Sequence, residues 1–69
     1  MATIDEIINQ CSEEQAEQIY LKLEEVENII QNVSGLSFIE LLNIEEFYYL
    51  NYIEYLAFHK FCKEITGNK

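Results

Sequence analysis

The first half of the chain carries apolar side chains at alternating intervals of three and four residues. This is the spacing at which side chains line one face of an α-helix. The apolar positions are Ala16, Ile19, Leu23, Val26, Ile30 and Val33. Away from this stripe, the same segment carries an acidic face made of Glu13, Glu17, Glu24, Glu25 and Glu27. The pattern predicts an amphipathic helix over about residues 13–33.

A second apolar series with the same spacing runs through the other half of the chain. Its members are Leu41, Ile44, Tyr48, Asn51, Tyr55, Phe58, Cys62 and Ile65. The series predicts a helix over about residues 38–66 whose seam packs on the first stripe as an antiparallel hairpin. We therefore expect Tyr48, Tyr55 and Phe58 to lie in the core.

This second helix is apolar on its other sides as well. A helix that is apolar nearly all round is normally buried nearly all round, but only two other helices are available to cover it. Large exposed apolar patches usually mark interfaces. We therefore predict that part of this surface is a partner or dimer interface, formed by Phe47, Tyr49, Tyr52, Ile53, Leu56 and Phe61.

Three capping patterns predict where the helices begin. Thr3 with Glu6 opens a short helix over about residues 4–10, Ser12 precedes acidic residues that favour a helix N-terminus, and Ser37 with Glu40 opens the last helix. Gly35 lies between the two long helices, where it can adopt the left-handed conformation that ends a helix. Near the end of the chain, Gly67 is expected to cap the last helix.

Asn43 offers an alternative within the last helix. With Glu46 three residues later, it could cap a new segment, and the chain would then hold four helices rather than three. A chain of 69 residues has room for one domain. The predicted fold is therefore a single all-α domain over residues 1–69, a short helix followed by a long helical hairpin, completed as a bundle by dimerisation.

The charge of the chain restricts its partners. Thirteen acids against four lysines give a net charge of −9, and the acids concentrate before residue 36. Such a surface repels nucleic acids and anionic membranes, and it attracts basic proteins. The acidic face has two interpretations: it solvates an otherwise apolar protein, or it mimics phosphates and occupies the groove of a nucleic-acid-binding protein.

The sequence offers little chemistry for catalysis or metal binding. His59 and Cys62 stand one helical turn apart and Cys11 could join them, but zinc needs three or four ligands, so a packed cysteine and a partly exposed histidine are favoured. Whether Cys11 and Cys62 form a disulfide is not decided by the sequence. No nucleophile or phosphate-loop motif is present. We expect neither an enzyme nor a bound cofactor or metal.

Two functions fit these features. The first is an inhibitor or modulator that binds a larger, basic or nucleic-acid-binding protein, as phage and viral antagonists, immunity proteins and antitoxins do. The second is a self-assembling structural or adaptor subunit, in which the aromatic surface is a homodimer interface. The N-terminus lacks the basic and apolar regions of a signal peptide, so a cytoplasmic location is expected, in the host cytoplasm if the protein is viral.

Overall fold

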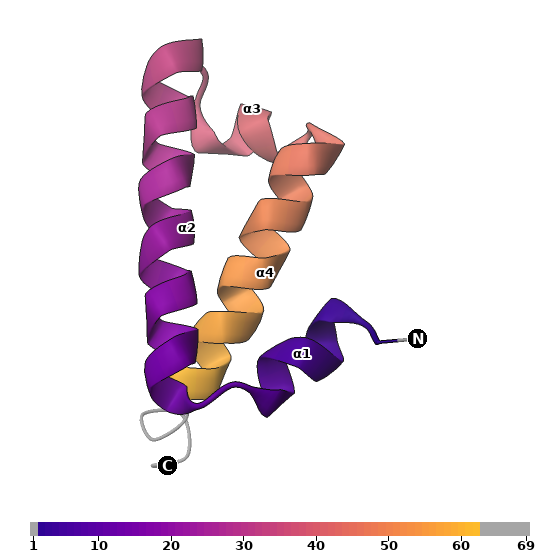
Figure 1. Cartoon of the computed structure of the whole chain (residues 1–69). Helices are drawn as coiled ribbons and strands as arrows, with labels where there is room; N and C mark the ends of the chain where they lie inside the picture. The colour runs from indigo at the N-terminus through magenta and orange to yellow at the C-terminus, as the bar shows by residue number, and fades with distance from the viewer. Residues whose placement is uncertain (1, 63–69) are drawn as a thin grey trace, which may run out of the picture.

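Four helices make up the part of the chain described by the computed structural model, residues 2–62 (Figure 1). They are α1 (Ile4–Gln10), α2 (Glu13–Ser34), α3 (Phe38–Leu42) and α4 (Glu45–Phe61). No strand occurs within these residues. The predicted all-α class is therefore confirmed, and the helix count is that of the alternative with a break near Asn43.

The three capping patterns act as predicted. Ser12 is the N-cap of α2, where its hydroxyl accepts from the backbone N–H of Gln15 at 3.1 Å, while the Gln15 side chain accepts from the Ser12 N–H at 3.0 Å. The same reciprocal pair of bonds joins Thr3 to Glu6 and Ser37 to Glu40. These bonds satisfy backbone donors that the first turn of a helix leaves free.

The turn after α2 also follows the prediction. Gly35 is the C-cap of α2, with φ at 72°, and its N–H donates to the carbonyl of Gln31. Only glycine adopts this left-handed conformation without steric cost, so the chain can leave α2 sharply at this point.

The break near Asn43 replaces the single long helix predicted over 38–66. Asn43 is the C-cap of α3; its N–H donates to the carbonyl of Glu40, and the N–H of Ile44 donates to the carbonyl of Leu41. The N-cap of α4 is Ile44, which makes no side-chain capping bond, so the role expected for Asn43 as the cap of the next segment was wrong. The predicted continuation to residue 66, the seam position Ile65 and the cap at Gly67 lie outside the described residues.

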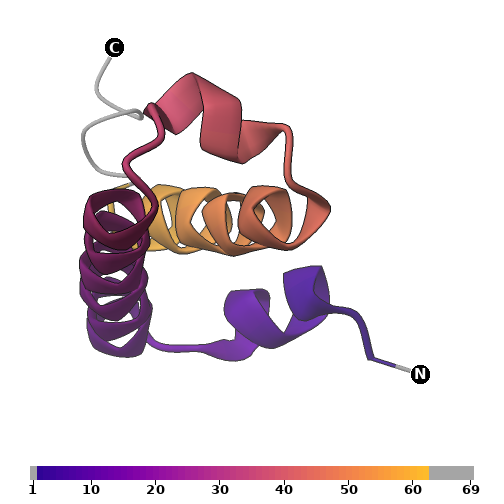
Figure 2. The ribbon, with the colours of Figure 1, turned by 90° about the horizontal axis from the view of Figure 1, so that it is seen from above.

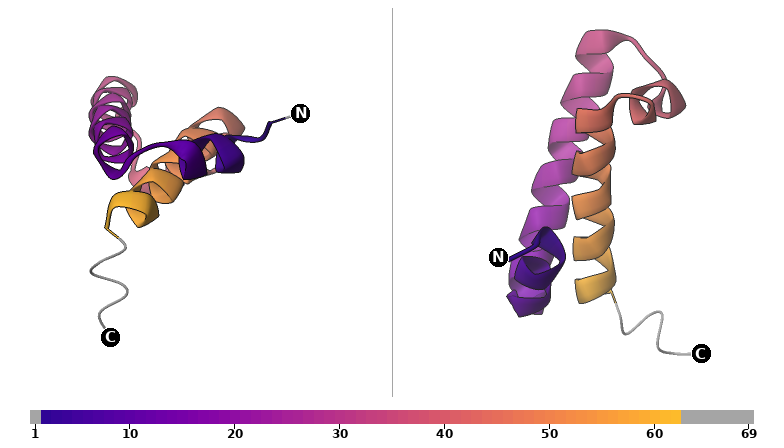
Figure 3. Two further views of the ribbon diagram at one scale, coloured as in Figure 1. Left: turned by 60° about the horizontal axis from the view of Figure 1, so that its bottom comes forward. Right: turned by 90° about the vertical axis from the view of Figure 1, so that its right-hand side faces the viewer.

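Helix α4 lies at the centre of the arrangement. It packs most extensively on α2, which runs in the opposite direction, and it also contacts α1 and α3. Viewed from above, α4 lies between α3 and α1, with α2 along one side (Figure 2). The chain reaches α4 from α2 through α3, which crosses over one end of the pair (Figure 3).

The core that these contacts bury is small. Its apolar members are Ile8, Ala16, Leu41, Phe47 and Ala57. The two alanines are fully buried, one on α2 and one on α4, where small side chains allow helices to approach closely. The Phe38 ring of α3 meets the Phe47 ring edge to face, with centroids 5.9 Å apart. Since the chain buries so few large side chains, much apolar surface stays exposed.

Two long-range hydrogen bonds hold α1 on α4. The Tyr52 hydroxyl donates to the carboxylate of Asp5 at 2.9 Å, and the Lys60 ammonium donates to the backbone carbonyl of Asn9 at 2.8 Å. They join opposite ends of α1 to side chains two helical turns apart on α4. These bonds fix the direction of a helix that is too short to be stable alone.

The faces that α2 and α4 bury differ from the predicted seams. Tyr48 and Tyr55 are 56% and 58% exposed, and Phe58 is also exposed, so the prediction that these three lie in the core was wrong. On α2, the stripe is confirmed in part: Ala16 is buried and Ile19, Leu23 and Ile30 are half-buried, whereas Val26 and Val33 are exposed. The larger difference is on α4, which must contact three helices at once and whose tyrosines keep their hydroxyls in water.

Candidate protein-binding surfaces

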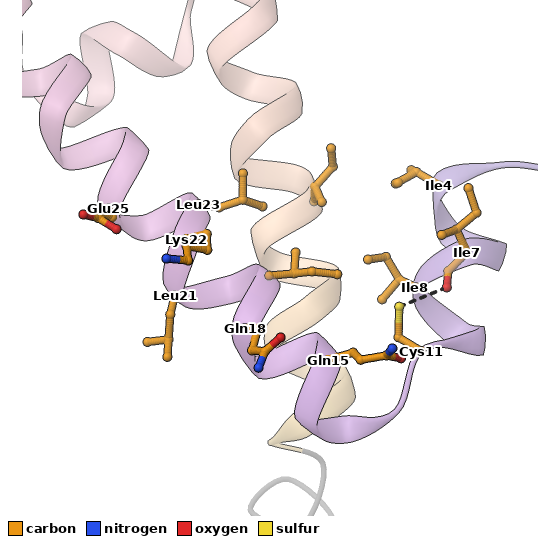
Figure 4. Close-up of a pocket in the computed structure, with 12 residues that line it drawn as sticks. Ile4, Ile7, Ile8, Cys11, Gln15, Gln18, Leu21, Lys22, Leu23 and Glu25 are labelled. Carbon is orange, nitrogen blue, oxygen red and sulfur yellow. Dashed lines mark hydrogen bonds between the residues drawn. The ribbon is translucent and has the colours of Figure 1, made fainter.

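An open groove of about 950 Å³ separates α1 from α2 (Figure 4). Ile4 and Ile7 of α1 lie on one side, Ile19 and Leu23 of α2 lie on the other, and Ile53 of α4 also lines the groove. Polar residues of α2 border it, among them Gln15, Gln18, Lys22 and Glu25. An apolar groove with a polar border is the form of a site that binds an amphipathic helix.

The groove exists because α1 is short and is held away from α2. Cys11 and Ser12 connect the two helices directly, yet α1 packs mainly on α4. Ile7 is about half exposed in the groove, whereas Ile8, the next residue, is buried. The groove has no distinct signature in the sequence, because the isoleucines of α1 indicate a packed helix equally well.

The predicted interface residues are divided between several environments. Tyr49 is 57% exposed and Tyr52 is also exposed, in agreement with an accessible position. Phe47 is buried against Phe38, which contradicts its assignment to an exposed interface. Ile53 lines the groove and is half-buried, as are Leu56 and Phe61. These six residues therefore do not form one continuous surface.

A further exposed surface lies along α4 and its N-cap. Tyr48 and Tyr55 of α4 and the N-cap residue Ile44 are exposed, although the sequence pattern placed all three on the packed seam. Tyr55 packs edge to face on His59, with ring centroids 4.3 Å apart. We call Ile44, Tyr48 and Tyr55 the tyrosine face of α4. It is the second candidate surface for association.

The acidic face is exposed except at one position. Glu13, Glu17, Glu24 and Glu25 are exposed, whereas Glu27 is only 7% exposed. The assignment of Glu27 to the acidic face was therefore wrong. The face that α2 turns inward contains Ala16, Leu23 and Glu27, and it carries Glu27 toward α4.

Glu27 meets a second carboxyl group, that of Glu54 on α4. Burial raises the pKa of Glu54 to about 8, assisted by the hydrogen bond to Glu27 and by the charges of Glu27 and Glu24. No other group within residues 2–62 is hydrogen-bonded to Glu27 Oε2 or Glu54 Oε1. Two carboxyl groups in contact share a proton because both cannot ionise without strong repulsion. The sequence pattern gave no sign of this pair, since Glu54 also fits a solvated position.

The two cysteines are free thiols, and one of them lies in the lining of the groove. Cys11 and Cys62 are half-buried free thiols, and the Cys11 thiol donates to the carbonyl of Ile7 at 3.4 Å. Within residues 2–62, the His, Cys, Asp and Glu side chains form no group of three that could hold a metal ion. Cys11 is one of the residues that line the groove.

Comparison with protein-family models, with curated proteins and with solved structures gave no match to this chain. None of the helices within residues 2–62 combines the length and the apolarity that are needed to cross a membrane.

Proposed function

We propose that this is a small, acidic, non-enzymatic protein that inhibits or modulates a larger protein by binding one of its amphipathic helices. The observation that carries the proposal is the groove between α1 and α2, where apolar side chains from three helices remain uncovered. The larger protein is basic, of the kind that binds nucleic acids, and the setting is cytoplasmic.

The dimensions of the groove suit a helix. A helix is about 10 Å wide and rises about 1.5 Å per residue, so two turns span about 11 Å, and an open groove of about 950 Å³ has room for a segment of that size. Two turns present apolar side chains at positions i, i+3, i+4 and i+7, which are the anchors of helix-in-groove binding. The bound helix would complete a bundle that α1 is too short to close.

The charge favours a basic partner. The chain carries −9, and the exposed Glu13, Glu17, Glu24 and Glu25 lie on α2, the helix that forms one side of the groove. A surface of one sign accelerates the approach of an oppositely charged partner and weakens its hold when salt is added. A basic amphipathic helix would place its apolar side in the groove and its cations beside these carboxylates.

A designed peptide tests the proposal. A helical peptide with leucine at the anchor positions and lysine elsewhere should bind the full chain and shift the methyl NMR signals of Ile7, Ile19 and Leu23. A peptide of the same composition in scrambled order, which cannot form an apolar stripe, is the control. Equal shifts with both peptides, or shifts outside the groove, would contradict the proposal.

The tyrosine face of α4 supports a second candidate function, that of a self-assembling structural or adaptor subunit. Tyr48 and Tyr55 are seven residues apart, as the a positions of a heptad repeat are, and both are more than half exposed. Two copies could bury these faces against each other as a homodimer. In this function the acidic residues of α2 serve only to keep the assembly in solution.

A further inference from the structure

A second, smaller hollow of about 230 Å³ lies between α2 and α4. Three aromatic side chains line it, Tyr20, Tyr55 and Phe58, together with Asn51 and Glu54. The Tyr20 and Phe58 rings are 5.4 Å apart, so the α2 and α4 sides of the hollow are in contact through them. The hollow shares no lining residue with the groove, and Asn51 and Ile53 project about 160° apart around α4.

One acidic side chain, Glu54, lines the hollow, and it is hydrogen-bonded to a second acid, Glu27, which does not line it. No other group within residues 2–62 is bonded to Glu54 Oε1 or Glu27 Oε2, so the hydrogen bond between the two acids requires a proton on one of them. Glu27 is 93% buried, so water cannot solvate its charge. In the free protein the raised pKa of Glu54, about 8, keeps that carboxyl protonated near neutral pH, and its proton offsets this cost. A cation supplied from outside would offset it equally well.

We propose that this hollow binds the guanidinium group of an arginine side chain from the partner protein. Aromatic ring faces attract cations, and arginine stacks on them more readily than lysine does. The planar guanidinium also donates several hydrogen bonds in a fixed geometry, which suits the carboxylate of Glu54 in the lining of the hollow. The chain itself contains no arginine, so a second copy cannot supply the group.

The inference rests on the proposed function in one respect, that the arginine belongs to a protein partner. Binding of the guanidinium exchanges one positive charge for another, and the proton that is released can be measured. The guanidinium pairs with the Glu54 carboxylate, and the proton that Glu54 carries in the free protein leaves to solvent. No covalent bond changes. Binding near neutral pH should therefore release a proton, whereas binding to the exposed glutamates of α2 should not.

The test uses small probes on the full chain. N-acetyl-arginine amide should produce saturating NMR shifts at Tyr20, Asn51 and Tyr55, and calorimetry in buffers of different ionisation enthalpy should show the proton release. N-acetyl-citrulline amide, which is nearly the same shape but uncharged, should bind about tenfold more weakly or not at all. Equal binding of the two probes would overturn the proposal.

Matched variants complete the test. Glu54→Gln should weaken the arginine probe about tenfold and abolish proton release, while Glu46→Gln, an exposed acid on the same helix, should leave both unchanged. Circular dichroism checks that each variant keeps its helicity. Shifts confined to the acidic face of α2, or an unaltered response in Glu54→Gln, would overturn the proposal. These probes lack an apolar helix, so their failure leaves the groove and its peptide test unaffected.

Discussion

Glu27 of α2 and Glu54 of α4 hold their carboxyl groups in hydrogen-bond contact between the two helices that pack most extensively. Glu27 is almost fully buried, and the pair is bordered by a third acid, Glu24. A helix pair of this kind would ordinarily join through apolar side chains. Here the contact depends on a proton, and this makes the stability of the fold sensitive to pH.

The first prediction is that stability falls as the pH rises from about 4.5 to about 8 and that Glu54 adds no further fall above that range. The folded pKa of Glu54, about 8, lies above its ordinary value of 4.5, so folding favours the protonated form. This contribution is fully present below about pH 4.5 and is lost as the pH rises through about 8. Thermal unfolding followed by circular dichroism from about pH 5 to about pH 9 should show a falling midpoint.

The variant Glu54→Gln identifies the group responsible. It removes the ionisation but keeps the shape, so its unfolding midpoint should change less with pH and should exceed that of the natural chain above pH 8. A variant that kept the same pH dependence would assign the effect to other carboxyl groups.

The second prediction concerns Leu41, the largest side chain that is fully buried. Leu41→Ala should lower the free energy of unfolding by about 3 kcal/mol, because it removes apolar contacts and leaves a cavity where α3 meets the rest of the fold. Ile39→Ala is the control, since Ile39 lies on the same short helix but is 75% exposed. Urea denaturation of both variants gives the comparison, and similar losses would contradict the described packing of α3.

The third prediction is that the Tyr52 hydroxyl holds α1 in place. The hydrogen bond to Asp5 is the main cause that raises the pKa of Tyr52. Tyr52→Phe should therefore speed hydrogen exchange in the α1 amides while leaving α2 protected. Tyr49→Phe is the control, because the Tyr49 hydroxyl reaches only Glu45 on its own helix. Unchanged α1 exchange in Tyr52→Phe would mean that Ile8 and Lys60 suffice to dock this helix.

The fourth prediction tests the groove through Ile7. Ile7→Glu places a charge in the groove at a side chain that is already half exposed, so the fold should remain while the leucine-lysine peptide loses about tenfold or more of its affinity. Ile39→Glu introduces the same change on an exposed position outside the groove and should bind normally. If both variants bind the peptide equally, the peptide does not occupy the groove.

The fifth prediction addresses self-association. If the tyrosine face forms a homodimer, light scattering behind size exclusion should give twice the mass of 8.2 kDa, and replacing Tyr48 and Tyr55 with lysine should return the mass to that of one chain. A mass of one chain over a wide concentration range would reject the homodimer and leave the tyrosine face available to another protein.

Local structure was largely predictable from the sequence. The caps at Thr3, Ser12 and Ser37 and the turn at Gly35 depend on hydrogen bonds and backbone angles within three or four residues, so the sequence alone determined where helices start and where α2 ends. The same local rules allowed for a break near Asn43, although they assigned the next cap to the wrong residue.

The tertiary structure decided which face each helix buries. On α4, apolar side chains surround the axis, so periodicity could not distinguish the buried Phe47 and Ala57 from the exposed Tyr48 and Tyr55. The choice depends on where α1, α2 and α3 make contact, which no local pattern encodes. The groove, the arginine hollow and the Glu27–Glu54 pair all follow from that choice, because each is formed by side chains distant in sequence that meet only when the helices pack.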